Sequence, residues 1–206
     1  MKDQGILTVV SGFSGVGKGT LMRELLTAMT TMHCLFSATT RSPREGEVHG
    51  REYFFATREE FELMIQQEKL IEYAEYVGNY YGTPKEYVLS QLTDGKDVIL
   101  EIEIQGAQKI RQQFPEALLL FVVAPTAEEL KRRLTGRGTE SADVIEARLR
   151  RAAEESEGMD QYDYLLVNDT VENCVERMHQ LIQSQHRKVS NCRNFIRDMK
   201  EELKQF

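Results

Sequence analysis

The sequence ILTVVSGFSGVGK, residues 6–18, decides the fold class of this chain. Its first six residues are mostly apolar or β-branched and predict a buried strand. The residues from Lys18 to about Met32 have helical spacing, and a glycine-rich loop separates them from the strand. A strand, a loop and a helix in this order open a parallel α/β sheet that is flanked by helices.

The loop fits the pattern G-x-x-x-x-G-K of a phosphate-binding loop. Glycines let successive backbone N–H groups turn toward phosphate oxygens, and the start of the helix adds a positive dipole end. Lys18 is expected to reach the β- and γ-phosphates of a nucleotide. We therefore predict a fold of the P-loop NTPase type, with a nucleotide site at Gly12, Phe13, Ser14, Gly15, Val16, Gly17, Lys18, Gly19 and Thr20.

The chain departs from this pattern after the lysine. A serine or threonine normally follows and binds Mg²⁺, but here Gly19 follows and Thr20 comes one residue later. One residue turns the side chain by about 100° around a helix. The sequence therefore predicts no direct protein ligand for Mg²⁺, which instead binds through phosphates and water.

The rest of the chain continues the α/β pattern with one interruption. Strand patterns are expected at 98–102, 118–123 and 165–167, and Thr170 is expected to cap a long final helix. The interruption spans about residues 37–91 and reads as an insertion in the core. It contains one helix, which Thr57 and Glu60 begin at capping-box spacing.

Composition excludes several classes of partner. The formal net charge of −7 disfavours nucleic acid and membrane surfaces, which favour proteins rich in Lys and Arg. The longest strongly apolar run, Ala117–Ala124, is far shorter than the roughly 20 residues that span a bilayer. Cys34, Cys174 and Cys192 lack metal-ligand spacing, so we expect reduced thiols and a cytoplasmic protein.

A second anion site is predicted in the insertion. Arg41 and Arg44 are three residues apart and are able to clamp one phosphate through paired hydrogen bonds. Tyr53 and Tyr81 are further donors for the same phosphate. Glu72 is a carboxylate on a strand-like segment.

With these motifs the chain resembles the guanylate kinase family, and it looks closest to bacterial members. The resemblance rests on the phosphate loop, T-T-R-x-P-R-x-G-E at 39–47, G-N-Y-Y-G-T at 78–83 and R-G-T-E at 137–140. It implies one domain that transfers a phosphoryl group from ATP to GMP with Mg²⁺. The implied parts are a core (about 1–36, 92–126 and 159–188), a GMP-binding part (37–91), a lid (127–158) and a C-terminal extension (189–206).

The resemblance also implies roles for individual residues. The GMP phosphate is assigned to Arg41, Arg44, Tyr53 and Tyr81, and guanine to Ser37, Glu72 and Thr83. The transferring phosphoryl group is assigned to Lys18, Arg41, Arg133, Arg137 and Arg148. Arg137 is expected to pack on adenine near Asn168. Acidic residues near GMP and the metal-bound waters are Glu101 and Glu103, which we expect on one side of a strand at 100–104; the family more often has Asp at position 103.

The chemistry of guanine agrees with the role of Glu72. Guanine presents two neighbouring donors, N1–H and the 2-amino group, and one carboxylate accepts both. Adenine presents an acceptor at N1 and is repelled. No residue stands out as an obligatory base, which suits phosphoryl transfer, where positioning and charge neutralisation supply most of the rate.

Two other readings remain open at this point. One is a non-catalytic scaffold that binds a peptide in the GMP cleft, although such modules lose the loop lysine or parts of the arginine array that this chain keeps. The other is a kinase for a different small molecule, such as a ribose bisphosphate. In that case Glu72, Ser37 and Thr83 would have no base to read.

The C-terminus has a different pattern. Apolar residues at 3–4 spacing form a narrow seam, which is typical of a helix that pairs with another helix. The seam consists of Val175, Met178, Ile182, Val189, Cys192, Ile196, Met199, Leu203 and Phe206, with Gln185 in its one gap. We expect the extension either to join two copies of the chain or to bend back onto its own domain.

Overall fold

The fold is that of a computed structural model. The structure describes residues 4–28, 32–34, 37–44, 46–50, 53–76, 78–136 and 141–206.

The core is a parallel sheet of five strands in the order β2-β7-β1-β8-β9. The strands are β1 (Leu7–Gly12), β2 (Met32–Cys34), β7 (Asp97–Glu101), β8 (Leu118–Val123) and β9 (Tyr164–Val167). In register, Val10 of the central strand lies beside Glu101 on one side and Leu120 on the other. The prediction of a parallel α/β sheet is confirmed, and strand 118–123 has the predicted bounds.

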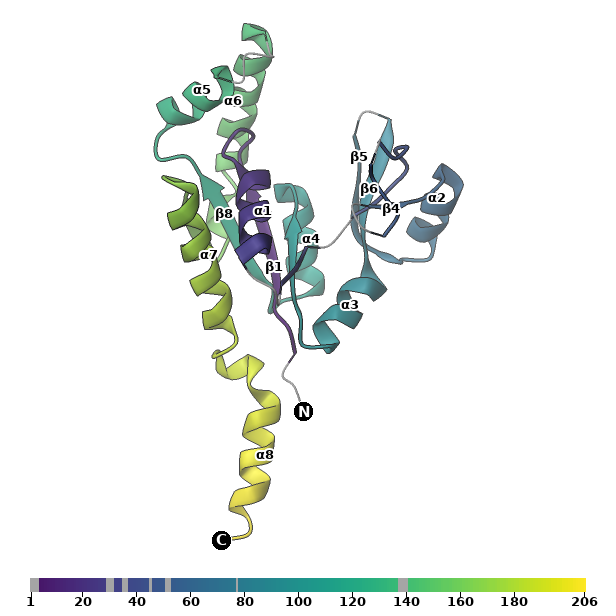
Figure 1. The fold of residues 1–206 in the computed structure, drawn as a ribbon, viewed down its shortest axis with the longest axis vertical. Helices are drawn as coiled ribbons and strands as arrows, with labels where there is room; N and C mark the ends of the chain where they lie inside the picture. Colours follow the sequence, from purple (N-terminus) through teal and green to yellow (C-terminus); the bar gives the residue numbers. More distant parts are fainter. Residues whose placement is uncertain are drawn as a thin grey trace.

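Helices cover both faces of this sheet (Figure 1). Helices α1 (Lys18–Ala28) and α7 (Val171–Gln185) pack on the face that carries Val10 and Leu120. Helices α3 (Lys85–Thr93) and α4 (Ile104–Gln113) pack on the face that carries Val9. The alternation of neighbouring strand residues between two apolar layers explains the continuous apolar runs of the strands.

A second sheet stands beside the first within residues 37–91 (Figure 1). It has four strands in the order β4-β3-β6-β5. They are β3 (Ala38–Thr39), β4 (Phe54–Phe55), β5 (Leu70–Tyr76) and β6 (Asn79–Pro84), and α2 (Arg58–Gln66) packs on them through the fully buried Phe61. The predicted capping box of α2 is confirmed, since Thr57 and Glu60 bond each other's backbone N–H.

The two sheets are joined through α4 and β5. The Gln113 side-chain amide donates to the Ile71 carbonyl at 2.8 Å. Ile71 itself is buried in the apolar layer beneath α3 and α4. The second sheet is thus anchored at one end to the main core.

Helices α5 (Ala127–Thr135) and α6 (Ala142–Ser156) lie at the end of the molecule where the loop between β1 and α1 is found (Figure 1). Leu130, Leu134 and Ala152 bury their side chains in the same apolar layer as α1 and α7. The region predicted as a lid therefore shares its hydrophobic core with the main sheet. Arg137 lies outside the described residues.

Two predicted boundaries are wrong. The helix predicted from Lys18 to Met32 ends at Ala28, and Met32 begins β2, which pairs with β7. The strand predicted at 100–104 ends at Glu101, and Glu103 instead precedes α4 as its N-cap residue. Glu101 and Glu103 therefore do not alternate on one strand. The pairing of β2 with β7 is a contact distant in sequence, and the start of α4 at Ile104 interrupts the strand pattern, so apolar spacing alone gives neither boundary.

The predicted long final helix is also wrong, because the chain breaks after α7. A short 3₁₀ turn, Val189–Asn191, separates α7 from α8 (Arg193–Leu203). The Asn191 amide donates to the Gln185 carbonyl at 2.9 Å, which satisfies the end of α7 and ends the helix there. Thr170 does cap the start of α7, as predicted.

The break divides the predicted apolar seam into two parts with different environments. Val175, Met178 and Ile182 are buried in the core. The residues on α8 are not, and Figure 1 shows this helix extending away from the rest of the chain. Among the helices of the described residues, none combines the length and apolar character needed to cross a bilayer.

This division gives a stability prediction. Ile182 is 0% exposed and Leu203 is 60% exposed. Ile182→Ala should lower the free energy of unfolding by about 2–5 kcal/mol, because it leaves a cavity in the core. Leu203→Ala should change it by less than about 0.5 kcal/mol. Urea unfolding at low protein concentration measures both, and equal losses would show that α8 belongs to the folded core.

Candidate active site

The phosphate loop connects the central strand β1 to α1, at the carboxyl end of the parallel sheet. Gly15 and Gly17 have φ angles of 89° and 94°, in the left-handed region that favours glycine. A Cβ atom on Gly15 would lie 2.7 Å from the Leu134 side chain of α5. The glycines therefore allow both the tight turn and the close packing of α5 against its outer side.

Lys18 folds over this loop. Its Nζ donates to the Gly12 carbonyl at 2.6 Å and to the Phe13 carbonyl at 3.3 Å. The ammonium group is thereby held at the loop without a carboxylate partner in these bonds. Gly19 and Thr20, which follow it, are exposed.

The outer side of the loop is held by Arg133 and Asn168. Asn168 is buried and its Nδ2 donates to the Val16 carbonyl at 2.7 Å. Arg133 donates to the same carbonyl at 3.4 Å and to the Asn168 carbonyl at 2.9 Å. Both residues were predicted to contact the nucleotide, and in this structure they contact the loop that would hold it.

Helix α6 approaches the loop from the other side. Arg148 donates to the Ser14 hydroxyl at 3.0 Å. Arg151, three residues later, pairs with Glu155 at 2.8 Å and lies 3.6 Å from Glu103. Two arginines of α6 are therefore directed at the loop and at the start of α4.

Glu101 ends β7 beside the phosphate loop. Its side chain has access to solvent, but the surrounding protein is dense enough for desolvation to raise the pKa of the carboxyl group, while nearby Lys18 lowers it. The structure thus places one of the two predicted acidic residues next to the lysine. Glu103 lies beyond the strand, facing α6 through Arg151.

In the second sheet, Glu47 orients the predicted arginine clamp. Arg41 Nη2 donates to both Glu47 oxygens at 3.0 and 2.9 Å, and its guanidinium lies 5.2 Å from the centre of the Tyr53 ring. Glu47 also accepts from the Arg44 backbone N–H at 2.7 Å. That bond and the Arg41 bond lower the pKa of Glu47. The Tyr53 and Tyr81 rings are 6.3 Å apart, so four predicted residues do come together.

Glu72 and Thr83 form the other predicted pair. They lie on adjacent strands, and the Thr83 hydroxyl donates to Glu72 Oε1 at 2.7 Å. Burial raises the pKa of Glu72, and the Thr83 bond and Lys109 oppose this shift. Ser37 lies nearby in the same sheet, where its carbonyl accepts from the Phe54 N–H at 3.1 Å.

Gly106 on α4 was not predicted. A Cβ atom there would lie 2.3 Å from Ile102 and 3.5 Å from Glu72 Oε2. A larger residue would clash with the Ile102 side chain, while its distance from Glu72 would be an ordinary contact. A glycine inside a helical pattern was the available sequence signal, because it costs helix stability and therefore needs a packing reason.

Glu47 and Glu129 were also missed as site residues. Each stands a few residues from the arginine that it holds, Arg41 or Arg133. For Glu47 the signal was its place at the end of the motif at 39–47, and for Glu129 it was the i,i+4 spacing to Arg133. In sequence alone, such pairs look like ordinary solvated charges.

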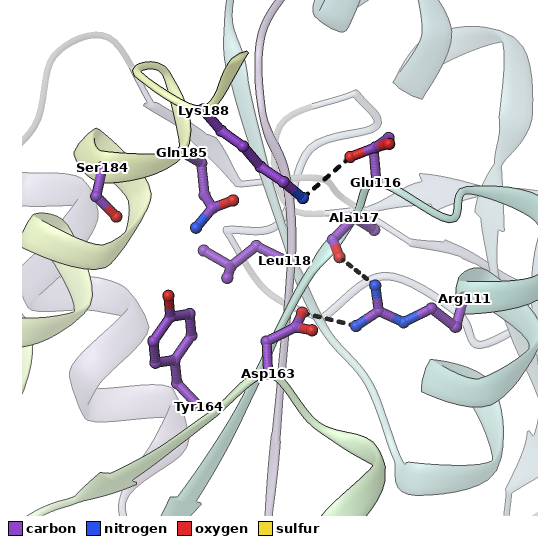
Figure 2. A pocket seen from close by; sticks show the side chains of 9 residues that line it. All are labelled: Arg111, Glu116, Ala117, Leu118, Asp163, Tyr164, Ser184, Gln185 and Lys188. Atoms are coloured by element: carbon purple, nitrogen blue, oxygen red, sulfur yellow. Dashed lines mark hydrogen bonds and ion pairs between the residues drawn. The ribbon is translucent and has the colours of Figure 1, made fainter. Parts of the chain in front are cut away.

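Figure 2 shows a pocket of about 490 Å³ that is not part of this site. It is lined by the starts of β8 and β9, and these strands run parallel to β1, so it lies at the opposite end of the sheet from the loop. Its charged side chains are already paired: Arg111 with Asp163 at 2.6 Å and Lys188 with Glu116 at 3.1 Å. We read it as a structural hollow.

The residues present fit Mg²⁺ only as a partner of bound phosphates. Within the described ranges, no three His, Cys, Asp or Glu side chains lie close enough together to hold a metal ion. The charge of Lys18 in the loop lowers the pKa of the Glu101 carboxyl group, so this carboxylate lies near the loop. Mg²⁺ commonly binds through one or two carboxylates, substrate phosphates and waters, which is what this arrangement offers.

Comparison with known proteins gives a consistent result. The sequence model of the family described as guanylate kinase matches residues 4–185. A guanylate kinase of Bacillus cereus is 51% identical over 201 residues, 97% of this chain and 98% of the relative. One of Bacillus subtilis (strain 168) is 52% identical over 189 residues, 91% and 93%. The crystal structure of guanylate kinase from Anaplasma phagocytophilum has a TM-score of 0.72 and 31% identity, covering 92% of this chain and 90% of that one.

Proposed function

This chain belongs to the guanylate kinase family, which transfers a phosphoryl group from ATP to GMP, and we propose that its two side-chain clusters divide these substrates between them. The cluster at the phosphate loop takes ATP. The cluster in the second sheet takes GMP. The observation that carries the assignment is the presence in one small subdomain of an arginine held by Glu47, Arg41, and a half-buried carboxylate, Glu72.

On the donor side, backbone N–H groups of residues 12–20 and Lys18 bind the ATP phosphates. The geometry that supports this is the pair of left-handed glycines and the lysine bound to loop carbonyls. Asn168 and Arg137 are assigned to adenine by the resemblance, and this assignment stays a proposal.

On the acceptor side, Arg41, Arg44, Tyr53 and Tyr81 bind the GMP phosphate. Glu47 holds Arg41 in place through both carboxylate oxygens, so less conformational entropy is lost when the phosphate binds. Glu72 accepts the guanine N1–H and 2-amino groups, with Thr83 and Ser37 as neighbours. The Thr83 bond fixes one oxygen of the carboxylate before the base arrives.

The transfer itself needs charge neutralisation more than a base. Negative charge spreads over the oxygens of the phosphoryl group as it moves, and cations already positioned around it stabilise that state. We assign this role to Lys18, Arg133, Arg137 and Arg148, with Arg41 on the acceptor side. Arg148 is the member of α6 that already contacts the loop.

Mg²⁺ belongs to this proposal as the partner of the ATP phosphates. When bound, it supplies charge neutralisation to the β- and γ-phosphate oxygens. Glu101 would face its water shell, and Glu103 is set further away.

A cytoplasmic location is likewise proposed, from the reduced thiols that the cysteine pattern predicts.

Closure of residues 127–158 over the substrates is also proposed. Arg133 of α5 and Arg148 of α6 already contact the phosphate loop, and binding of a second anion in the second sheet would favour a movement that brings the two sites together. Because α5 and α6 both bury side chains in the apolar core of the main sheet, we assign the larger displacement to the second sheet.

The C-terminal helix supports a further proposal, that two copies of the chain associate through α8. This helix has only 11 residues, and Phe195, Met199 and Leu203 on it are 62%, 41% and 60% exposed. A lone helix of this length is marginal in water, so a partner is expected to cover its apolar face. In an antiparallel pair centred on Met199, Arg197 of one copy faces Glu201 of the other. A parallel pair would place equal charges side by side.

The first functional prediction tests the reaction. Coupled assays of ADP release should show turnover with GMP and much less with AMP, UMP or CMP. Lys18→Met should lower kcat by roughly 10²-fold or more, since the charge is needed most as the phosphoryl group leaves. The fold should survive, as near-unchanged thermal unfolding would show. If the Lys18→Met variant keeps the kcat of the wild type, the assignment of this loop to the ATP phosphates is wrong.

The second concerns base recognition. Glu72→Gln replaces one acceptor by a donor that faces the donors of guanine, so kcat/KM for GMP should fall roughly tenfold to hundredfold. KM for ATP should barely change. Burial raises the pKa of Glu72, so protonation at low pH should weaken GMP binding at a higher pH than an ordinary glutamate would. The Glu72→Gln variant should lose this fall in GMP binding at low pH. If GMP and ATP binding weaken equally, Glu72 supports the structure and does not recognise the base.

The third concerns association. Deleting residues 189–206 should lower the mass measured by sedimentation and leave kcat within about threefold. Arg197→Glu and Glu201→Arg should each weaken self-association, because each puts like charges opposite one another in an antiparallel pair. A mixture of the two variants should associate again. A monomeric full-length chain, or no recovery in the mixture, would contradict this arrangement.

A further inference from the structure

The carbonyl of Val16, on the outer side of the phosphate loop, accepts hydrogen bonds from two side chains. Val16 is 0% exposed, and its oxygen accepts from Asn168 Nδ2 at 2.7 Å and from Arg133 Nη1 at 3.4 Å. The same peptide unit carries the N–H of Gly17. In a trans peptide the C=O and N–H point in opposite directions. Holding this carbonyl outward therefore turns the Gly17 N–H toward the inside of the loop.

Asn168 has no freedom to move away from this carbonyl. It is 4% exposed, and its backbone N–H donates to the Val123 carbonyl at 2.8 Å, continuing the pairing of β8 and β9. A Cβ atom on Gly17 would lie 3.0 Å from its Nδ2. The amide is thus packed against the backbone that it holds.

Arg133 is fixed in turn by Glu129. Arg133 Nε donates to Glu129 Oε1 at 2.7 Å, while Nη2 donates to the Asn168 carbonyl at 2.9 Å. Glu129 also accepts two bonds from Arg132, at 2.6 and 2.7 Å. Arg132 and then Arg133 lower the pKa of Glu129 to about 2, so the carboxylate stays charged at any ordinary assay pH.

We propose that Glu129 is a positioning residue for ATP, acting through Arg133 and Asn168 on the Val16–Gly17 peptide. Donors on a carbonyl polarise its peptide unit and strengthen the opposite N–H as a donor. The arrangement therefore orients the Gly17 N–H and makes it a stronger donor to a phosphate oxygen. This inference rests on the proposed function, because it assumes that the loop binds the phosphates of ATP.

The first experiment uses tripolyphosphate, a ligand without adenine. Asn168→Asp keeps the shape of the side chain and replaces the donor to Val16 by a negative oxygen. The inhibition constant of tripolyphosphate against ATP should rise roughly five- to tenfold, as for loss of a buried hydrogen bond. KM for GMP should stay within twofold. An unchanged inhibition constant would mean that Asn168 does not act through the loop, and would overturn the proposal.

The second experiment is a double-mutant cycle with a matched control. Glu129→Gln removes the charge that holds Arg133, and it should raise KM for ATP and the tripolyphosphate inhibition constant severalfold. In a chain that already carries Arg133→Gln, the same change should add nothing. Arg132→Gln removes the other partner of Glu129 and should leave both constants within twofold. Among the described residues, the Arg132 side chain bonds Glu129 and makes no bond to the loop.

The outcomes separate this inference from the proposed function. Additive effects of Glu129→Gln and Arg133→Gln, or equal effects of Arg132→Gln and Arg133→Gln, would contradict the positioning role. Thermal unfolding of each variant shows whether the fold is retained. If Asn168→Asp fails to fold, Glu129→Gln still tests the proposal, because the Glu129 side chain is partly exposed and its substitution disturbs the core less. Turnover of GMP by the unaltered chain tests the proposed function separately, since tripolyphosphate binding does not involve GMP.

Discussion

A phosphate site made of backbone N–H groups imposes a constraint on the carbonyls of the same loop. Each peptide that turns its N–H inward turns its C=O outward, and a buried carbonyl without a donor costs free energy. Here the outward carbonyl of Val16 receives donors from Asn168, just after β9, and from α5. The sheet order explains why this is possible, because β8 and β9 continue the sheet next to β1 and end at the same level as the loop.

The same logic applies to the charged groups that await a phosphate. Arginines that bind a phosphate need partners in its absence, and acidic residues supply them: Glu47 for Arg41, and Glu129 for Arg133. This reconciles a formal net charge of −7 with binding of two anionic nucleotides. The carboxylates Glu47 and Glu129 orient the arginines locally.

Much of the fold was predictable because its signals are local. Strand 118–123 was predicted to the residue, since a continuous apolar run between a Pro-containing turn and Pro125 leaves few alternatives. The capping box at Thr57 and Glu60 was predicted because its chemistry lies within one turn. The end of α1, the end of β7 and the break after α7 were not. The end of α1 is followed by pairing of β2 with β7, which requires the folded chain. The end of β7 and the break after α7 depend on the start of α4 and on the bond from Asn191 to the Gln185 carbonyl, which apolar spacing does not encode.

The site divides in the same way. The loop, the arginine clamp and the Glu72–Thr83 pair follow from motifs, and the structure brings Glu72 and Thr83 within hydrogen-bonding distance. What the sequence-based predictions omitted is the support: Glu47, the last residue of the motif at 39–47, and Glu129 were given no role, and in the structure they bond Arg41 and Arg133. Their contribution is geometric, since they fix side chains that otherwise sample many rotamers. In an enzyme that works by positioning and charge neutralisation, such supports set how much of the binding free energy is left to stabilise the transition state.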